Sequence, residues 1–232
     1  MPRYPLSEIR EISYPYLMKA FLFSDLHVNY KQLKNIEHFL VQEEDIDLLI
    51  FAGDIVNMGE PVGYVEQFLQ VLAKVNKPFF WVPGNNDFGR AYNKFNAKYR
   101  SLEGRVVQLA SLIPNTNPLI RFTGVGGSPA SWAGQYAGES MIDKELIGGS
   151  IFVSHVPPPG LVNLIRGDCD SPTQKKLSDA PLVHICGHVH HQWGTAYLGK
   201  TKIIKLAAME LGYYAILDLE SLKVDFQRFN NQ

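Results

Sequence analysis

The stretch YLMKAFLFSDLH, residues 16–27, is an apolar run that ends abruptly in a polar cluster. A short, continuous apolar run such as residues 16–23 is typical of a strand buried in a sheet. Asp25 and His27 follow this run directly. Because side chains two residues apart in an extended chain point to the same side, the sequence predicts that both face one site.

Four more predicted strands end in the same way. They are IDLLIFAG (46–53) before Asp54, FFWV (79–82) before GNND (84–87), SIFVS (150–154) before His155, and PLVHICG (181–187) before His188 and His190. Sheets of this kind bind ligands beyond the carboxyl ends of their strands. We therefore expect the five polar clusters to meet at one edge of a sheet.

The rest of the chain divides into a front half that alternates strands with helices and a back half rich in strands. Apolar residues at helical spacing predict helices over residues 29–44 and 62–75, and a short helix is expected over residues 91–102. Short strands separated by turns follow to the end of the sequence. This order predicts an α/β fold (α+β by some schemes) in which two packed β-sheets are flanked by helices.

The bulk composition narrows the function. A chain of 232 residues suits a single domain, residues 1–232, with residues 1–15 as a lead-in segment. The net charge of −1 gives no support for a nucleic-acid or membrane partner. Only two cysteines occur, Cys169 and Cys186, which favours a reducing, cytoplasmic location over a disulfide framework. No stretch approaches the ~20 apolar residues of a membrane helix.

The five clusters together hold a mixed set of oxygen and imidazole ligands. The set is Asp25, His27, Asp54, Asn85, His155, His188 and His190. Carboxylates combined with imidazoles suit Mn, Fe, Zn or Co better than Ca or Mg. A single catalytic ion usually takes about three protein ligands. The larger set fits two ions that share a bridging carboxylate, as enzymes of phosphoryl chemistry use.

Each cluster taken alone has a simpler explanation. Asp-x-His and Gly-Asp are common in turns and caps, and a lone histidine such as His155 is more often a hydrogen-bonded loop residue. The pair His188 and His190 is the most informative piece, because paired histidines at a strand end are uncommon. The metal-site prediction therefore depends on all five clusters occurring together, each after an apolar strand.

As a set, the motifs resemble those of the calcineurin-like metallophosphoesterase family. The family pattern is Asp-x-His, Gly-Asp, Gly-Asn-His-Asp/Glu, a single His and Gly-His-x-His, and the resemblance covers residues from about 17 to 210. The turn GVGGSP (124–129) and the loop SHVPPPG (154–160) are similar to the small bacterial and archaeal members. The resemblance implies a four-layer sandwich of two packed sheets flanked by helices.

The resemblance also implies a role for each ligand. Asp25, His27 and His190 would hold one ion, and Asn85, His155 and His188 the other, while Asp54 would bridge both. The implied activity is hydrolysis of a phosphomonoester or phosphodiester by a metal-bridging hydroxide, with Mn favoured over Fe, Zn, Ni or Co. The expected substrate is a small phosphoester, including nucleotide-like ones, and the oligomeric state stays open.

One position departs from the family pattern. The third motif reads Gly-Asn-Asn where the family has Gly-Asn-His, and that histidine serves the family as proton donor or transition-state stabiliser near the leaving group. Asn86 can donate only a neutral hydrogen bond. Loss of a general acid removes about 10²–10⁴-fold in rate, so we expect modest activity and a preference for aryl esters. The neighbouring Asp87 would either orient a ligand or pin the loop.

Two other functions remain open at this point, a metal-binding scaffold of the same fold with little hydrolase activity and a nuclease. A buried cluster of histidines and aspartates is costly without its ions, which favours an enzyme over a scaffold. The near-neutral charge gives a nuclease no support. His191, Arg90 and Arg166 are candidate substrate contacts, although a solvated surface position is the commoner outcome for each.

Overall fold

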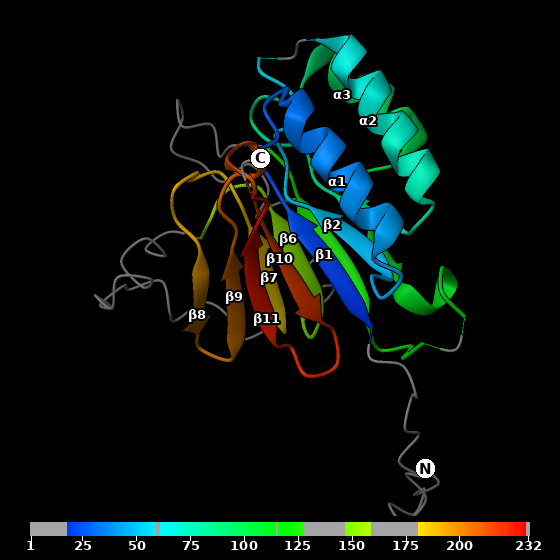
Figure 1. Ribbon diagram of the computed structural model, residues 1–232. Helices are drawn as coiled ribbons and strands as arrows, with labels where there is room; N and C mark the ends of the chain where they lie inside the picture. The colour runs from blue at the N-terminus through cyan, green and yellow to red at the C-terminus, as the bar shows by residue number, and fades with distance from the viewer. Residues whose placement is uncertain (1–17, 59–60, 115, 128–146, 159–180, 231–232) are drawn as a thin grey trace, which may run out of the picture.

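The computed structural model describes residues 18–58, 61–114, 116–127, 147–158 and 181–230. Two mixed β-sheets pack face to face, and three helices cover the outer face of one of them (Figure 1). The first sheet has the strand order β11-β10-β1-β2-β3, and the second has the order β4-β5-β6-β7-β9-β8. The predicted fold class, two packed sheets flanked by helices, is confirmed.

The strands agree closely with those expected from the sequence. The first sheet contains β1 (Lys19–Phe23), β2 (Leu48–Phe51), β3 (Phe79–Trp81), β10 (Tyr213–Asp218) and β11 (Val224–Arg228). The second contains β4 (Val106–Gln108), β5 (Arg121–Val125), β6 (Ile151–Ser154), β7 (Val183–Cys186), β8 (Gly194–Leu198) and β9 (Thr201–Lys205).

The pairing of the strands brings the predicted site together. β1, β2 and β3 run parallel in the first sheet, and β5, β6, β7 and β9 run parallel in the second. The last two strands return to the first sheet, where β10 pairs antiparallel with β1. The sequence did not indicate this pairing. The 3₁₀ turn η4 (Met209–Leu211), which lies between β9 and β10, is thereby placed next to the end of β1.

The three helices lie on the first sheet. They are α1 (Tyr30–Gln42), α2 (Val62–Val75) and α3 (Gly89–Lys98). Asn29 caps α1, since its side-chain oxygen accepts a hydrogen bond from the backbone N of Gln32. The third helix begins and ends earlier than the expected residues 91–102. It ends at Lys98, since the chain is already extended at Tyr99.

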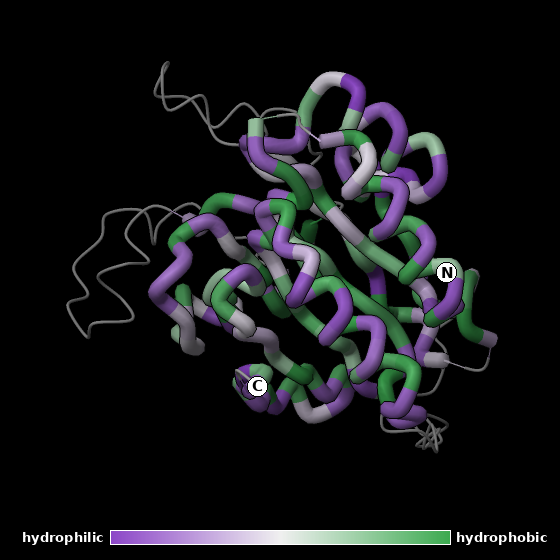
Figure 2. The backbone as a smooth tube through the Cα atoms, turned by 45° about the horizontal axis from the view of Figure 1, so that its top comes forward, coloured by the Kyte–Doolittle hydropathy of each residue, from purple (hydrophilic) through white to green (hydrophobic). Residues whose placement is uncertain are grey.

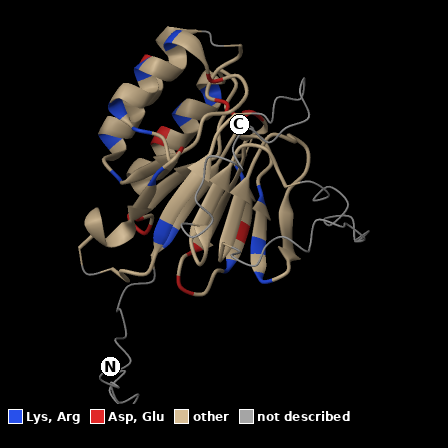
Figure 3. Ribbon diagram, turned by 180° about the vertical axis from the view of Figure 1, so that it is seen from behind, with Lys and Arg blue, Asp and Glu red and all other residues tan. Residues whose placement is uncertain are grey.

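The core has two layers, one on each side of the first sheet. Along β1, Phe21 faces the helices, whereas Leu22 faces the second sheet, as strand alternation requires. Phe80 of β3 stacks on Phe122 of β5, with ring centroids 4.1 Å apart. Full burial of such a side chain contributes roughly 1.5–3 kcal/mol. Hydrophobic residues are concentrated in the strands, whereas charged residues are frequent on the helices (Figures 2 and 3).

Two smaller expectations concern membrane-spanning segments and cysteines. No helix in the described part of the chain is both long enough and apolar enough to cross a membrane. Cys186 is a buried free thiol, as expected, and burial raises its pKa to about 12. Cys169 lies outside the described residues.

Candidate metal centre

The predicted ligands do meet at one edge, where the parallel strands of both sheets end. The ends of β1, β2 and β3 supply Asp25, His27, Asp54 and Asn85, and the ends of β6 and β7 supply His155, His188 and His190. Two ring nitrogens 163 residues apart in the chain, Nε2 of His27 and Nε2 of His190, lie 3.1 Å from each other. The contact places the two sheets' polar clusters in one site.

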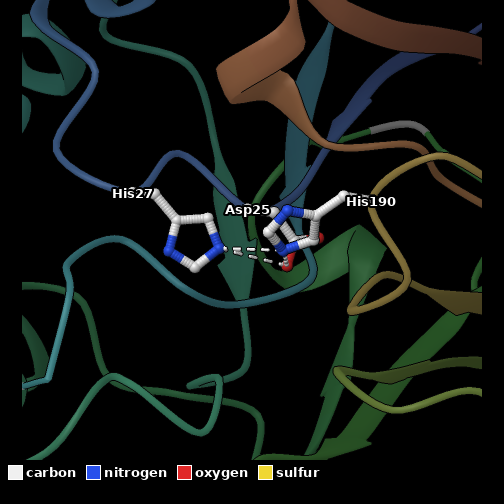
Figure 4. Close-up of side chains that lie close together, drawn as sticks. All are labelled: Asp25, His27 and His190. Carbon is white, nitrogen blue, oxygen red and sulfur yellow. Dashed lines mark hydrogen bonds and ion pairs between the residues drawn. The ribbon is translucent and has the colours of Figure 1, made fainter.

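The first group of candidate ligands is Asp25, His27 and His190, with one ligand atom from each lying close together. Asp25 Oδ1 is 3.7 Å from His27 Nε2 and 3.5 Å from His190 Nε2 (Figure 4). This carboxylate oxygen is buried and has no hydrogen-bond partner among the described residues. A buried, unpartnered oxygen beside two imidazole nitrogens fits a cation, which would satisfy all three atoms.

The second group is Asn85, His155 and His188. Nε2 of His155 lies 3.0 Å from Asn85 Oδ1 and 3.1 Å from His188 Nδ1. The other ring nitrogen of His155, Nδ1, donates to the carbonyl of Ala52 at 2.7 Å. That bond fixes the tautomer, so a neutral His155 presents the lone pair of Nε2 to the site.

Asp54 lies between the two groups. Its Oδ2 is 3.3 Å from His155 Nε2 and 3.6 Å from His27 Nε2. Asp25 is also close to the second group, since it clusters with Asp54 and His155. Two buried carboxylates thus lie close to the imidazoles of both groups, an arrangement that fits a pair of divalent ions.

The backbone reaches this geometry through left-handed turns. Asp25, His27, Asp54 and His188 have φ of 56°, 45°, 63° and 74°. The expectation that Asp25 and His27 share a side through extended alternation was therefore wrong about the cause, although the two side chains do converge. Backbone strain of this kind costs on the order of 1–3 kcal/mol per residue and gathers at functional sites.

Glycines make the close approach of the loops possible. A Cβ on Gly84 would lie 2.0 Å from Asp54 Oδ1, so any side chain there would displace that carboxylate. Gly53 has φ of +93°, a conformation that favours glycine. Both glycines therefore allow the Asp54 loop to pack closely against the GNND loop.

Charges in the site are balanced between carboxylates and imidazoles. Burial opposes ionisation of Asp25, yet the neighbouring imidazoles of His190 and His27 hold its pKa well below the usual range. Burial likewise opposes protonation of His27 and His155, but the nearby carboxylates raise the pKa of each to about 9. Binding of cations would replace these protons, which makes metal affinity depend on pH.

Asp87 binds the backbone of the two loops that carry Asp54 and Asn85. It is buried, and its carboxylate accepts hydrogen bonds from the backbone N of Gly84 (2.9 Å), Asp54 (2.8 Å), Ile55 (2.8 Å) and Val56 (3.2 Å). Burial raises its pKa to about 6. Of the two roles left open for Asp87, this geometry supports pinning of the loop.

The amide of Asn86 is engaged with the protein. Its backbone N donates to Asp54 Oδ1 and its Nδ2 donates to Asp54 Oδ2, each at 2.8 Å. Its Oδ1 accepts a hydrogen bond from the backbone N of Met58 at 3.3 Å. In this arrangement the donors of Asn86 serve a carboxylate of the site.

The sequence did not indicate the residues that bind the second ring nitrogen, Nδ1, of two candidate histidine ligands. Asn57 Oδ1 is 2.8 Å from His27 Nδ1, and Glu210 Oε1 is 2.6 Å from His190 Nδ1. Asn57 could have been found, since it lies in the same loop as Asp54, but no local signal marks Glu210. Of the candidate substrate contacts, Arg90 and His191 are exposed, and Arg166 lies outside the described residues.

Known proteins resemble this chain in sequence. The family described as calcineurin-like phosphoesterase matches residues 18–192. The 3',5'-cyclic adenosine monophosphate phosphodiesterase CpdA of Haemophilus influenzae is 32% identical over 89 residues, 36% of this chain and 31% of that protein. A probable cyclic nucleotide phosphodiesterase of Pseudoalteromonas sp. is 26% identical over 132 residues, 54% of this chain and 48% of that protein.

A solved structure shows the same fold at low sequence identity. The crystal structure of TT1561 of Thermus thermophilus superposes with a TM-score of 0.65 at 16% identity, covering 91% of this chain and 99% of that one. The matched part of the present chain spans less than half the length of either phosphodiesterase relative.

Proposed function

The chain belongs to the calcineurin-like phosphoesterase family, and we propose that it hydrolyses a small phosphodiester of the cyclic-nucleotide class with the help of two divalent metal ions. The substrate class is suggested by the two relatives, both of which are named as cyclic nucleotide phosphodiesterases. The mixture of carboxylate and imidazole ligands suits Mn, Fe, Zn or Co, and of these metals we favour Mn.

The observation that carries this proposal is the position of Asp54 between two groups of histidines. Asp25, His27 and His190 would hold one ion, and Asn85, His155 and His188 the other, with Asp54 shared. Bound ions would lower the pKa of water and neutralise charge on the phosphoryl oxygens.

Hydrogen bonds from neighbouring residues fix the positions of the proposed ligands. Asp87 fixes the Asp54 loop, and Ala52 fixes the ring of His155. Asn86 supplies only neutral N–H donors, and these already bind Asp54. Asn86 stands at the position of the family's histidine acid and does not titrate. We therefore propose that an aryl phosphodiester reacts faster than cyclic AMP, whose leaving group is an alkoxide.

The test is a hydrolysis profile of the purified chain, combined with measurement of its metal content. We expect about two Mn²⁺ per chain and hydrolysis of an aryl phosphodiester and of cyclic AMP, both abolished by a chelator and restored by Mn²⁺. Asn85→Ala should lower the affinity for the second ion. Asn93→Ala, on the exposed face of α3, is the matched control and should leave both measurements unchanged.

Two results would contradict the proposal. Tightly bound metal without hydrolysis of any monoester or diester would support the scaffold function instead. Failure to bind metal at all would exclude both the phosphoesterase and the metal-binding scaffold.

A further inference from the structure

We propose that Glu210 is a positioning residue for the metal centre, which orients the ring of His190 and fixes its tautomer. This inference rests on the proposed function, because it assumes that His190 is a metal ligand. Glu210 lies beyond residue 192, where the match to the family ends. It comes from η4, a part of the chain to which no motif drew attention.

The contact that carries the inference joins the far side of the imidazole to a carboxylate. Nδ1 of His190 lies 2.6 Å from Oε1 of Glu210, while Nε2 of the same ring is 3.5 Å from Asp25 Oδ1. A carboxylate can only accept, so Nδ1 carries the proton. Nε2 of the neutral ring then presents its lone pair to the site.

Glu210 is held in place by the backbone around it. Its N donates to the carbonyl of Asp25 at 2.9 Å, and its own carbonyl accepts from Asn29 Nδ2 at 3.0 Å. The N of Met209 donates to the carbonyl of Ser24 at 2.8 Å, and the N of Ala208 donates to the carbonyl of His190 at 3.0 Å. The turn is therefore fastened both to the strand end that carries Asp25 and to the loop that carries His190.

The same device recurs at two other histidines of the site, with a different acceptor each time. His155 Nδ1 binds the carbonyl of Ala52, and His27 Nδ1 lies 2.8 Å from Asn57 Oδ1. His190 is the one of these three whose acceptor carries a charge. An ionised partner makes the stronger hydrogen bond and raises the basicity of the ligand nitrogen.

The exposure of the His190 and Glu210 side chains determines whether removal of Glu210 should affect stability or metal binding. The side chains of His190 and Glu210 are 32% and 29% exposed, so the pair resembles a surface ion pair, which contributes little to stability. Its effect on a bound metal is larger, since loss of a hydrogen-bonding partner behind a ligand typically costs about 10–100-fold in affinity. Removal of Glu210 should therefore weaken metal binding and leave folding almost unchanged.

The first measurement uses the metal-free protein and does not depend on activity. The ¹⁵N shifts of the His190 ring, recorded at a pH where the ring is neutral, report which nitrogen carries the proton. We expect the Nδ1–H tautomer in the wild type and in Glu210→Gln, whose amide oxygen still accepts. Glu210→Ala should shift the population toward the Nε2–H tautomer.

The second measurement is a titration with Mn²⁺. Glu210→Ala should weaken one of the two sites by about 10–100-fold, with a smaller loss in Glu210→Gln. Glu220→Ala, an exposed glutamate in the turn after β10, is the matched control and should bind as the wild type does.

The outcomes separate the two proposals. An unchanged tautomer together with unchanged Mn²⁺ affinity in Glu210→Ala would overturn the role of Glu210 and leave the metal centre intact. A wild type that binds no Mn²⁺ would overturn the proposed function and with it the effect of Glu210 on metal binding. A tautomer that still depends on Glu210 would then show a purely structural contact.

Discussion

Asn86 binds both carboxylate oxygens of Asp54, one through its backbone N and the other through its side-chain Nδ2, each at 2.8 Å. The two bonds hold the plane of the carboxylate that stands between the two groups of histidines. The residue that departs from the family pattern is thus attached to the proposed bridging ligand. If Asn86 orients Asp54, its removal should have different kinetic effects than if Asn86 assists the leaving group.

Asn86→Ala distinguishes these roles. If Asn86 serves Asp54, the variant loses a hydrogen bond to a charged group, worth about 1.5–3 kcal/mol, and its kcat/KM should fall by a similar factor for aryl and alkyl phosphoesters. Mn²⁺ affinity should fall as well. Steady-state kinetics on a matched aryl and alkyl pair of diesters checks this, with Asn93→Ala as control. A selective loss with the alkyl ester would show instead that Asn86 assists the leaving group.

Asn86→His tests what the missing acid costs. An imidazole at this position could donate a proton, so turnover of the alkyl phosphoester should rise relative to that of the aryl ester. The ratio of the two kcat values is the measurement, because it cancels any general loss through Asp54. An unchanged ratio would mean that the leaving group obtains its proton elsewhere or needs none.

Asp87→Asn should damage the loop that carries Asp54. The native carboxylate accepts four backbone N–H bonds, and an amide of the same shape turns two of its own hydrogens toward those donors. Unsatisfied buried donors cost about 1–3 kcal/mol each, so we expect a loss of several kcal/mol in unfolding free energy. Urea unfolding measures it. Asp225→Asn on exposed β11 is the control, and an equal effect in both variants would contradict the role of Asp87.

The sequence predicted those parts of the site that local patterns encode. An apolar strand followed by Asp, Asn or His is visible in a few residues, which is why the ends of β1, β2, β3, β6 and β7 were all found. Contacts between distant segments are not written in any short stretch. Pairing of β10 with β1 brings Glu210 to His190, and nothing near Glu210 in the sequence signals that contact.

The backbone of the site was the other part that could not be read from the sequence. Alternation along a strand predicts that residues two apart share a side, and the expectation for Asp25 and His27 used that rule. Their positive φ values depend on loop contacts such as the bond from Asp25 N to the carbonyl of Gly53. Tertiary contacts of this kind override local preference.

The buried ammonium of Lys205 lies next to the loop that carries His188 and His190. It is 1% exposed, and its Nζ donates to the carbonyls of Val189, at 3.0 Å, and Leu206. Val189 stands between the predicted ligands His188 and His190, so the ammonium fixes the loop that carries both. Burial lowers the pKa of Lys205.

Lys205→Met should therefore weaken metal binding more than it weakens the fold. Removing the buried ammonium leaves the carbonyls of Val189 and Leu206 without this donor but also removes a desolvation cost, so we expect the two effects on stability to offset each other. Mn²⁺ titration and urea unfolding of the same variant give the comparison, with exposed Lys200→Met as control. Loss of stability without loss of metal affinity would contradict this account.

His184 is not one of the predicted ligands, and we expect it to make the stability of the fold depend on pH. The hydroxyl of Ser154 donates to the carbonyl of Val156, so His184 Nε2 donates to Ser154 Oγ at 2.7 Å. Burial lowers the pKa of His184 to about 4. The folded state therefore binds fewer protons than the unfolded state between pH 4 and the unfolded value of about 6.5.

The sign of the effect follows from this proton difference. Stability from the neutral ring is fully present above about pH 6.5 and is lost as pH falls toward 4, by about 3 kcal/mol in total. His184→Gln keeps an N–H donor for Ser154 but does not titrate, so its unfolding free energy should decline less over this range. Urea unfolding at stepped pH checks the difference, and His38→Gln, exposed on α1, should follow the wild type. Equal slopes for the wild type and His184→Gln would show that His184 does not resist protonation in the fold.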